Sequence, residues 1–129
     1  MNTKDIPTLK ELEQLYDPAS IIIDVRSPGE FTHAHIPGAH NIPLFSDKER
    51  AEIGTAYKQV SREDAIEIGM KYADPRRQQY VSQLRDLMNG RNNARIIVHC
   101  WRGGMRSASM AELFTTSGID VELVEGGYK

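Results

Sequence analysis

The fold of this chain is decided by residues 95–107, which read Arg-Ile-Ile-Val-His-Cys-Trp-Arg-Gly-Gly-Met-Arg-Ser. The apolar run at their start, residues 95–99, is typical of a strand buried in a parallel sheet. The run ends at Cys100, and after a glycine-rich loop the apolar positions take helical spacing from Ser107 to about Ser117. A strand, a tight loop and a helix in this order predict that Cys100 lies at the carboxyl end of a strand, where α/β sheets hold their ligands.

Three more segments have the pattern of strands, and they are residues 20–25, 40–42 and 121–124. Segments with helical features alternate with them. Thr8 opens a capping box, which predicts a short helix to about Leu15. Residues 46–89 are predicted to be mainly helical, with an N-cap at Ser61 and an interruption at Pro75. This alternation predicts an α/β domain with a mostly parallel central sheet flanked by helices on both faces.

Length, charge and hydropathy narrow the class of protein. A chain of 129 residues suits a single domain, residues 1–129, with one core. The net charge of −2, with acidic and basic residues well mixed, gives no sign of the basic face expected for unaided nucleic-acid binding. No apolar run approaches the roughly 20 residues that a membrane span needs, and residues 1–17 are too polar for a signal peptide. We therefore expect a cytoplasmic protein that does not bind a membrane.

Cys100 is the single cysteine, so an intramolecular disulfide and a zinc site built from several cysteines are excluded. A lone cysteine is commonly an inert buried side chain, so its neighbours decide its role. Two glycines let the loop fold tightly over the sulfur, and the loop amides and the start of the next helix can form an anion site. Nearby arginines add positive charge, which favours a thiolate, a persulfide anion or a bound oxyanion.

We therefore predict that Cys100 is catalytic and that the loop after it binds the substrate or an anion. The predicted binding residues are Trp101, Arg102, Gly103, Gly104, Met105 and Arg106. Trp101 can shield the sulfur or stack on a base, and simple packing explains it equally well. The alternative to a binding role is that Gly103 and Gly104 only form a turn and that the arginines are solvated surface groups.

Three charged residues near the first strand are predicted to support the site, and they are Asp24, Arg26 and Glu30. They can line the active site, although a structural role, as an ion pair or as hydrogen bonds to the loop, is the favoured interpretation for Asp24 and Arg26. Glu30 is a candidate partner of Arg26.

The histidines are predicted to be structural. His99 precedes Cys100 on the strand, so its side chain points to the opposite face and is poorly placed to act as a general base. His35 and His40 flank a turn and are not expected to bind a metal, so we expect no metal site.

Several motifs resemble those of the rhodanese domain, over about residues 7–127. Residues 24–43 contain Asp-Val-Arg, Glu-Phe and His-Ile-Pro-Gly-Ala-His-Asn-Ile-Pro, which are similar to the first half of such a domain. Val-His-Cys at residues 98–100 and the loop after it are similar to the second half. The stretch around the cysteine, residues 99–107, and the insert, residues 49–63, also resemble bacterial tRNA 2-selenouridine synthases.

The narrower resemblance implies a transferase that replaces sulfur by selenium in the wobble 2-thiouridine of tRNA. Selenophosphate would be the donor substrate, and a geranylated thio intermediate is associated with the family. The resemblance implies that Cys100 is catalytic, either as a nucleophile or as the carrier of a persulfide or selenium–sulfur adduct. It implies no cofactor in this domain.

Bacterial tRNA 2-selenouridine synthases, which this sequence resembles, continue past the rhodanese domain into a P-loop domain. This chain has no G-x-x-x-x-G-K-[ST] match, so we interpret residues 1–129 as an N-terminal fragment without that C-terminal domain. The resemblance implies that the missing domain makes most of the contacts with tRNA, and that the fragment alone is incomplete as an enzyme.

The loop also supports rival functions. Cys100 and Arg106 have Cys-x5-Arg spacing, one residue longer than in many single-domain rhodaneses. This spacing resembles dual-specificity phosphatases and arsenate reductases of the same fold, in which the thiolate attacks phosphorus and the arginine binds the oxygens. A phosphatase would need a general acid, for which Asp24 or Glu30 are the candidates. A generic thiosulfate-type sulfurtransferase and an idle binding module are further alternatives, and the intact cysteine argues against the last.

Overall fold

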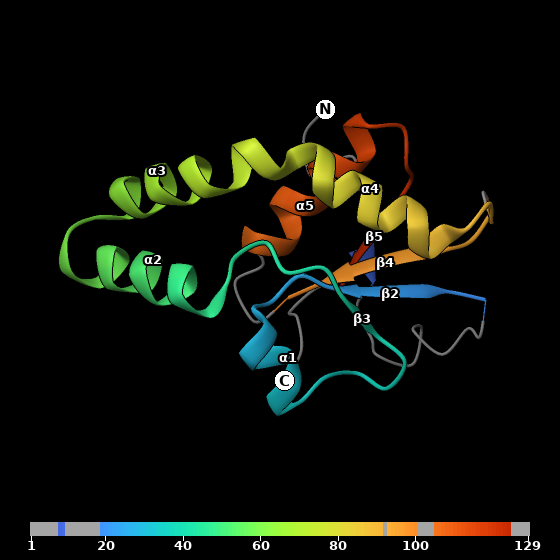
Figure 1. The fold of residues 1–129 in the computed structure, drawn as a ribbon, viewed down its shortest axis with the longest axis horizontal. Coiled ribbons are helices and arrows are strands. Elements are labelled where there is room, and N and C mark those ends of the chain that lie inside the picture. The colour runs from blue at the N-terminus through green and yellow to red at the C-terminus, as the bar shows by residue number, and fades with distance from the viewer. Residues whose placement is uncertain (1–7, 10–18, 92, 101–104, 125–129) are drawn as a thin grey trace.

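The computed structural model describes residues 8–9, 19–91, 93–100 and 105–124. Its centre is a sheet of five parallel strands in the order β1-β5-β4-β2-β3 (Figure 1). The strands are β1 (Thr8–Leu9), β2 (Ile21–Asp24), β3 (His40–Asn41), β4 (Ile96–His99) and β5 (Glu122–Val124). β4 therefore lies at the middle of the sheet, between β5 and β2. The predicted α/β class with a parallel sheet is confirmed.

Helices occupy the long connections that parallel strands require. They are α1 (Pro28–His33), α2 (Asp47–Gln59), α3 (Arg62–Ala73), α4 (Arg77–Met88) and α5 (Met105–Thr116), with a short 3-10 segment, η3 (Asp74–Arg76), between α3 and α4. Pro75 lies in η3, because proline lacks the N–H that an α-helix would use and its ring crowds the preceding turn. The interruption predicted at Pro75 is confirmed.

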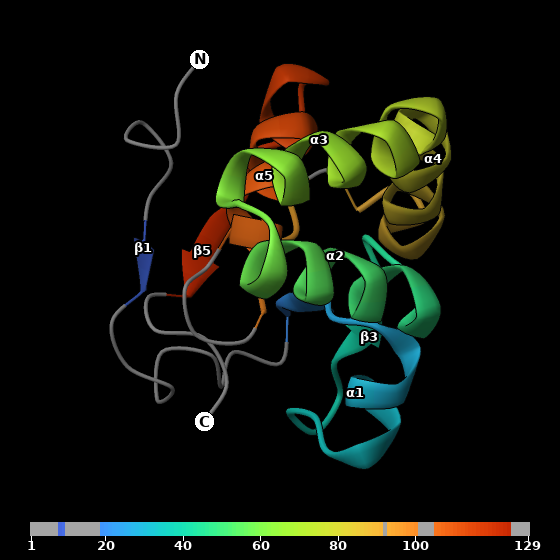
Figure 2. The ribbon, with the colours of Figure 1, turned by 90° about the vertical axis from the view of Figure 1, so that its left-hand side faces the viewer.

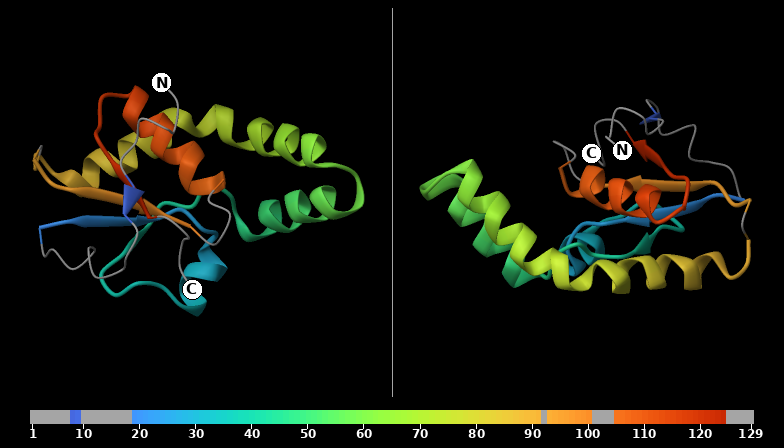
Figure 3. Two further views of the ribbon diagram at one scale, coloured as in Figure 1. Left: turned by 180° about the vertical axis from the view of Figure 1, so that it is seen from behind. Right: turned by 90° about the horizontal axis from the view of Figure 1, so that it is seen from above.

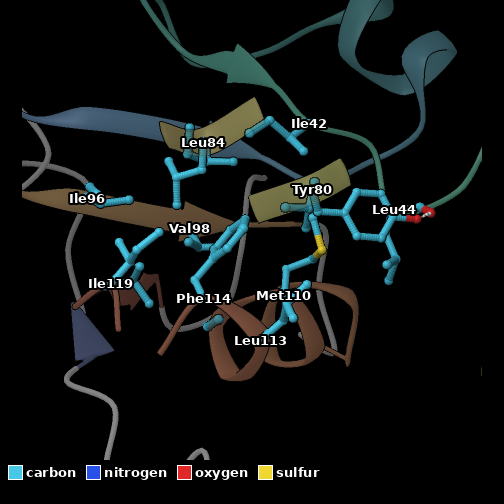
Figure 4. Close-up of a cluster of buried hydrophobic side chains, with 14 of the residues drawn as sticks. Ile42, Leu44, Tyr80, Leu84, Ile96, Val98, Met110, Leu113, Phe114 and Ile119 are labelled. Carbon is cyan, nitrogen blue, oxygen red and sulfur yellow. Dashed lines mark hydrogen bonds between the residues drawn. The ribbon is translucent and has the colours of Figure 1, made fainter. Parts of the chain in front are cut away.

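The main core lies between the sheet and the helices α4 and α5. Every residue of β2 and β4 is buried. Burial on both faces explains why the first three residues of each strand are all apolar, rather than alternating between apolar and polar residues. Figure 4 shows side chains from three elements meeting in this core, among them Tyr80 and Leu84 of α4, Val98 of β4, and Met110 and Phe114 of α5. Burial of large apolar side chains of this kind is the main stabilising contribution to such a fold.

The opposite face of the sheet carries a smaller apolar cluster. Ile22, Ile97 and Val124 pack there against Ile36 and the partly buried Ala39. Ile36 and Ala39 belong to the turn that connects α1 to β3, and Figure 1 shows α1 on the side of the sheet away from α4 and α5. The described helices therefore lie on both sides of the sheet, with α4 and α5 on one side and α1 on the other.

Helices α2 and α3 form a hairpin that projects from the sheet, and we call residues 47–73 the helical arm (Figures 2 and 3). Ser46 and Ser61 are the N-cap residues of its two helices. Each serine hydroxyl accepts a hydrogen bond from the N–H three residues later, which confirms the N-cap predicted at Ser61. Gly69 lets α3 approach Phe45, because a Cβ at this position would lie 3.2 Å from the Phe45 ring.

Two predictions of local structure need correction. Thr8 and Leu9 form β1 rather than the start of a helix, because their backbone pairs with Leu123 and Val124 of β5. The rest of that predicted helix lies outside the described residues. Helix α5 begins at Met105, earlier than the start predicted at Ser107. None of the described helices combines the length and the apolar composition needed to span a membrane.

Candidate active site around Cys100

Cys100 follows directly after His99, the last residue of the central strand β4. This is the carboxyl end of the strand, as the sequence predicts, and it is the edge at which parallel α/β sheets place their ligands. The side chain is 2% exposed and belongs to the main core cluster. The sulfur is therefore held in a fixed position at the sheet edge rather than on a solvated loop.

Ser107, in the first turn of α5, contacts the sulfur of Cys100 twice. The thiol donates to Ser107 Oγ, with Sγ and Oγ 3.1 Å apart, and the Ser107 N–H donates to Sγ over 3.4 Å. Ser107 is itself 2% exposed. A hydroxyl can reverse its hydrogen bond and donate to a thiolate, and the first turn of a helix favours negative charge. Both contacts therefore suit an ionised sulfur.

Ser107 was not among the predicted site residues, although the sequence places it at the expected start of the helix. Its contact depends on the packing of the first turn of α5 against the end of β4. The sequence feature that could have identified Ser107 is the presence of a hydroxyl residue directly after the arginine of the Cys-x5-Arg spacing.

Arg106 forms a bidentate ion pair with Glu30 of α1. Arg106 Nη1 lies 2.6 Å from Glu30 Oε1, and Arg106 Nη2 lies 3.2 Å from Oε2. Ser27 fixes the same carboxylate, because its N–H and its hydroxyl donate to Oε1 over 3.0 and 2.9 Å. Partial burial raises the pKa of Glu30, but the hydrogen bonds from Arg106 and Ser27 and the Arg106 charge outweigh it and lower the pKa to about 2.

The predicted ion pair between Asp24 and Arg26 is present and buried. Arg26 Nη2 lies 2.7 Å from Asp24 Oδ2, and the Arg26 Nε and backbone N–H also donate to this carboxylate over 3.0 Å. Arg26 Nη2 further donates to the carbonyl of Ala34, after α1. Among the described residues, the carboxylate partner of Arg26 is Asp24 and not Glu30, so that predicted pairing is wrong. Glu30 instead faces Arg106 and Arg50.

His99 is fully buried on the strand, with Nε2 3.7 Å from Asp24 Oδ2. Burial lowers the pKa of His99, although the Asp24 charge opposes this, so burial favours the neutral ring. Strand alternation puts His99 with Ile97, on the face opposite to Val98 and Cys100. His99 is therefore poorly placed to take a proton from the sulfur.

Four residues of the predicted binding loop, Trp101, Arg102, Gly103 and Gly104, lie outside the described residues, so the anion site predicted from the loop amides stays a prediction. Met105 and Arg106 begin α5, and the Met105 side chain is exposed. His35 stacks on Phe31 with ring centroids 3.8 Å apart, and His40 lies in β3.

A groove of about 260 Å³ lies beside the candidate site, between the helical arm and α5. Its lining includes Tyr57, Ile66 and Met70 of the arm, and Met105 and Arg106 of α5. The lining is mainly apolar. The groove therefore adjoins the last two residues of the predicted binding loop.

Comparison with known proteins places these features in a family. The Rhodanese-like domain family matches residues 8–129. The tRNA 2-selenouridine synthases of Nitrosomonas europaea and Shewanella denitrificans are 38% identical over 122 residues and 35% identical over 128 residues. These matches cover 94% and 98% of this chain, but 31% and 34% of the relatives. The chain thus spans about a third of the length of the curated relatives that it matches.

Solved structures share the fold. The N-terminal domain of a Clostridium difficile 630 protein, described as ATP/GTP binding, is 36% identical with a TM-score of 0.84, and the match covers 94% of this chain and 92% of that one. A rhodanese-like domain protein of Staphylococcus aureus is 24% identical with a TM-score of 0.54, covers 95% of this chain and 87% of its own, and shows the fold alone. The match over residues 8–129 and the shared parallel sheet show that the chain belongs to the rhodanese-like domain family.

Proposed function

We propose that this chain is the chalcogen-transfer domain of a tRNA 2-selenouridine synthase, in which Cys100 carries sulfur or selenium as a covalent adduct. The observation that carries the proposal is the position of Cys100, at the carboxyl end of the central strand and in contact with both the N–H and the hydroxyl of Ser107. The identity of 35–38% to enzymes of that name supports the choice of substrate.

The chemistry needs an ionised sulfur that attacks another chalcogen. With thiosulfate as a simple donor, the Cys100 thiolate attacks the outer sulfur, an S–S bond forms, and sulfite leaves with the electron pair of the broken bond. The product is a persulfide on Cys100. The Ser107 N–H and hydroxyl stabilise the thiolate before the attack, and the burial of Cys100 shelters the reactive sulfur from water.

In the whole enzyme, the acceptor would be the wobble 2-thiouridine of tRNA and the donor would be selenophosphate. Residues 1–129 would form one domain, and a further P-loop domain of the enzyme would supply most of the tRNA contacts. The work would take place in the cytoplasm, where tRNA is modified. The loop residues Trp101 to Arg106 would bind the donor or its oxyanion.

The phosphatase alternative is less well supported by the described carboxylates. A phosphatase needs a general acid that is protonated near neutral pH. The pKa of Glu30 is lowered to about 2, so this side chain is ionised. Asp24 is fully buried and is bound by Arg26.

Intact-protein mass spectrometry tests the proposal on the wild-type chain and on Cys100→Ser. We expect the wild type to gain one sulfur mass with thiosulfate, and one selenium mass with selenite and a thiol, while Cys100→Ser gains neither. Hydrolysis of an aryl phosphate should be negligible in both. The absence of a cysteine-dependent adduct, together with cysteine-dependent phosphate release, would overturn chalcogen transfer in favour of the phosphatase.

A further inference from the structure

The groove between the helical arm and α5 gathers most of the large apolar side chains that the described residues leave exposed. Five such side chains are 38–67% exposed, and four of them line this groove, namely Tyr57, Ile66, Met70 and Met105. The fifth is Val60, which does not line it. Exposed apolar side chains that gather at one place on a soluble protein commonly mark a binding surface. We therefore examined what kind of ligand this groove fits.

Two arginines that line the groove have no oxygen partner within the part of the chain that the structure describes. They are Arg62 and Arg77, and both are exposed. Every other arginine of the described residues has a carboxylate or a backbone carbonyl as its partner. Arg62 is also the first residue of α3, where a positive charge opposes the helix dipole, so helix stability does not account for it. Both charges are therefore available to a ligand.

The charge of the groove differs in sign from that of the whole chain. The chain has a net charge of −2, whereas the groove is lined by the three arginines Arg62, Arg77 and Arg106 and by one acidic residue, Asp74. Glu30 already pairs with Arg106, so a ligand would meet mainly the other two arginines. An apolar floor beside two unpaired cations suits a ligand with a flat apolar part and negative charge. Nucleotides have both, in the base and in the phosphate.

One end of the groove lies close to the candidate nucleophile. Met105 and Arg106 line the groove, and they directly precede Ser107, whose N–H and hydroxyl contact Cys100 Sγ. On the arm side, Tyr57 presents an aromatic ring that is 57% exposed. Proteins commonly hold the unpaired bases of RNA by stacking them on exposed aromatic rings. The groove therefore combines a stacking surface with a position near the sulfur.

We propose that this groove is a subsite for unpaired nucleotides of the acceptor RNA, in which Tyr57 stacks on a base and Arg62 and Arg77 bind neighbouring phosphates. The inference rests on the proposed function, in which the acceptor is a base of tRNA. It adds to that function an RNA-binding surface on the rhodanese-like domain itself. An RNA loop bound there would bring its bases toward Cys100, while the further domain of the whole enzyme would bind the rest of the tRNA.

Fluorescence anisotropy at low ionic strength tests the stacking, with a labelled RNA hairpin whose loop contains 2-thiouridine. Tyr57→Ala should raise the Kd of the 129-residue chain about tenfold, because a lost base–aromatic stack weakens binding to this extent. Tyr57→Phe keeps the ring and should bind like the wild type. Val60→Ala is the matched control, because it shortens an exposed apolar side chain of the same arm outside the groove, and it should leave the Kd unchanged.

The salt dependence of binding tests the two arginines. The double variant Arg62→Gln/Arg77→Gln should lower the slope of log affinity against log salt concentration by about 1.4, because each phosphate contact with a single strand contributes about 0.7. Lys58→Gln/Lys71→Gln removes two exposed charges from the same arm but outside the groove, and should lower the slope by less than about 0.5. All four positions are exposed, so the fold should tolerate these changes.

The absence of detectable RNA binding by the wild type would overturn the proposal, as would equal Kd values for the wild type and Tyr57→Ala. Binding of decanoate without binding of RNA would assign the groove to an apolar chain instead, and the proposal would be wrong. The sulfur adduct on Cys100 requires no RNA, so thiosulfate should form it equally in Tyr57→Ala and in the wild type. An adduct without groove-dependent RNA binding would therefore reject the subsite alone, whereas the loss of the adduct in the wild type would reject the proposed function.

Discussion

Ser107 is the residue that connects the candidate nucleophile to the helix behind it. Its hydroxyl and its N–H both reach Cys100 Sγ, and all of these groups are buried. In a site with little water, a hydrogen bond to an ionised group contributes more than one between neutral groups. We therefore expect Ser107 to affect the reactivity of Cys100 through its hydrogen bonds to the sulfur rather than through contact with a substrate.

Ser107→Ala should slow the alkylation of Cys100 by iodoacetamide at pH 7 by roughly tenfold, because a hydrogen bond to a charged group contributes about 1.5 kcal/mol. The backbone N–H remains in the variant, so the rate should not fall to zero. Ser109→Ala is the control, because Ser109 lies on the same helix and lines the groove instead. Equal alkylation rates in wild type and Ser107→Ala would show that the hydroxyl does not stabilise the thiolate.

The helical arm has few buried residues, and all of them are small. Its buried residues in α2 and α3 are Ala56, Ala65 and Gly69, which are small. The ion pair between Glu49 of α2 and Arg76 of η3 joins the first turn of the arm to the segment after α3. Because the arm buries little apolar surface, we expect the Glu49–Arg76 ion pair to help hold the arm in position.

The Glu49–Arg76 pair should make the stability of the protein depend on pH in the acid range. The hydrogen bond from Arg76 is the largest of the causes that lower the pKa of Glu49 from 4.5 to about 2. A carboxylate with a lowered folded-state pKa contributes its stability fully above the unfolded value and loses it as pH falls toward the folded one. Urea unfolding should therefore show Glu49→Gln less stable than wild type at pH 7.

The difference in unfolding free energy between the two proteins should shrink as pH falls from about 4.5 toward about 2. A difference that stays constant over this range would mean that Glu49 acts through packing rather than through its charge. Arg76 stays charged throughout, so the titration belongs to the carboxylate.

For the whole molecule, stability comes mainly from the core between the sheet and the helices α4 and α5. Phe114 is the largest of the fully buried side chains and lies at the centre of the cluster in Figure 4. The helix that carries Phe114 also carries Ser107 and Arg106. Packing of α5 against the sheet therefore positions the groups that contact Cys100 and Glu30.

Phe114→Ala should lower the free energy of unfolding by about 3–5 kcal/mol, because it removes buried apolar area and leaves a cavity. Val60→Ala is a suitable control, since Val60 is 67% exposed and an exposed substitution should change stability by less than about 0.5 kcal/mol. Urea unfolding at pH 7 measures both. A loss below about 1 kcal/mol in Phe114→Ala would mean that α5 is not fixed through this core.

Much of the fold follows from short-range properties of the sequence. The mainly apolar runs at residues 20–25 and 95–99 predict buried parallel strands, and the structure has strands there, β2 (Ile21–Asp24) and β4 (Ile96–His99). The N-cap at Ser61 and the break at Pro75 are equally local, because they depend on hydrogen bonds within one turn. The position of Cys100 at the end of a strand follows from the same pattern.

The partners of the charged residues required the tertiary structure. Asp24 and Arg26 are two positions apart, and their pairing was predicted, whereas Glu30 and Arg106 are separated by 76 positions. From the sequence alone, Arg26 was the candidate partner of Glu30, because the sequence gives no measure of how close α1 lies to the start of α5. The parallel sheet sets that distance, since it brings the segments that follow β2 and β4 to the same edge. By itself the sequence determined the order of the elements from β2 onward and the place of the cysteine. The packing of the sheet decided that Thr8 and Leu9 form a strand and which charge faces which, because strand pairing and ion pairing depend on distances that only the folded chain defines.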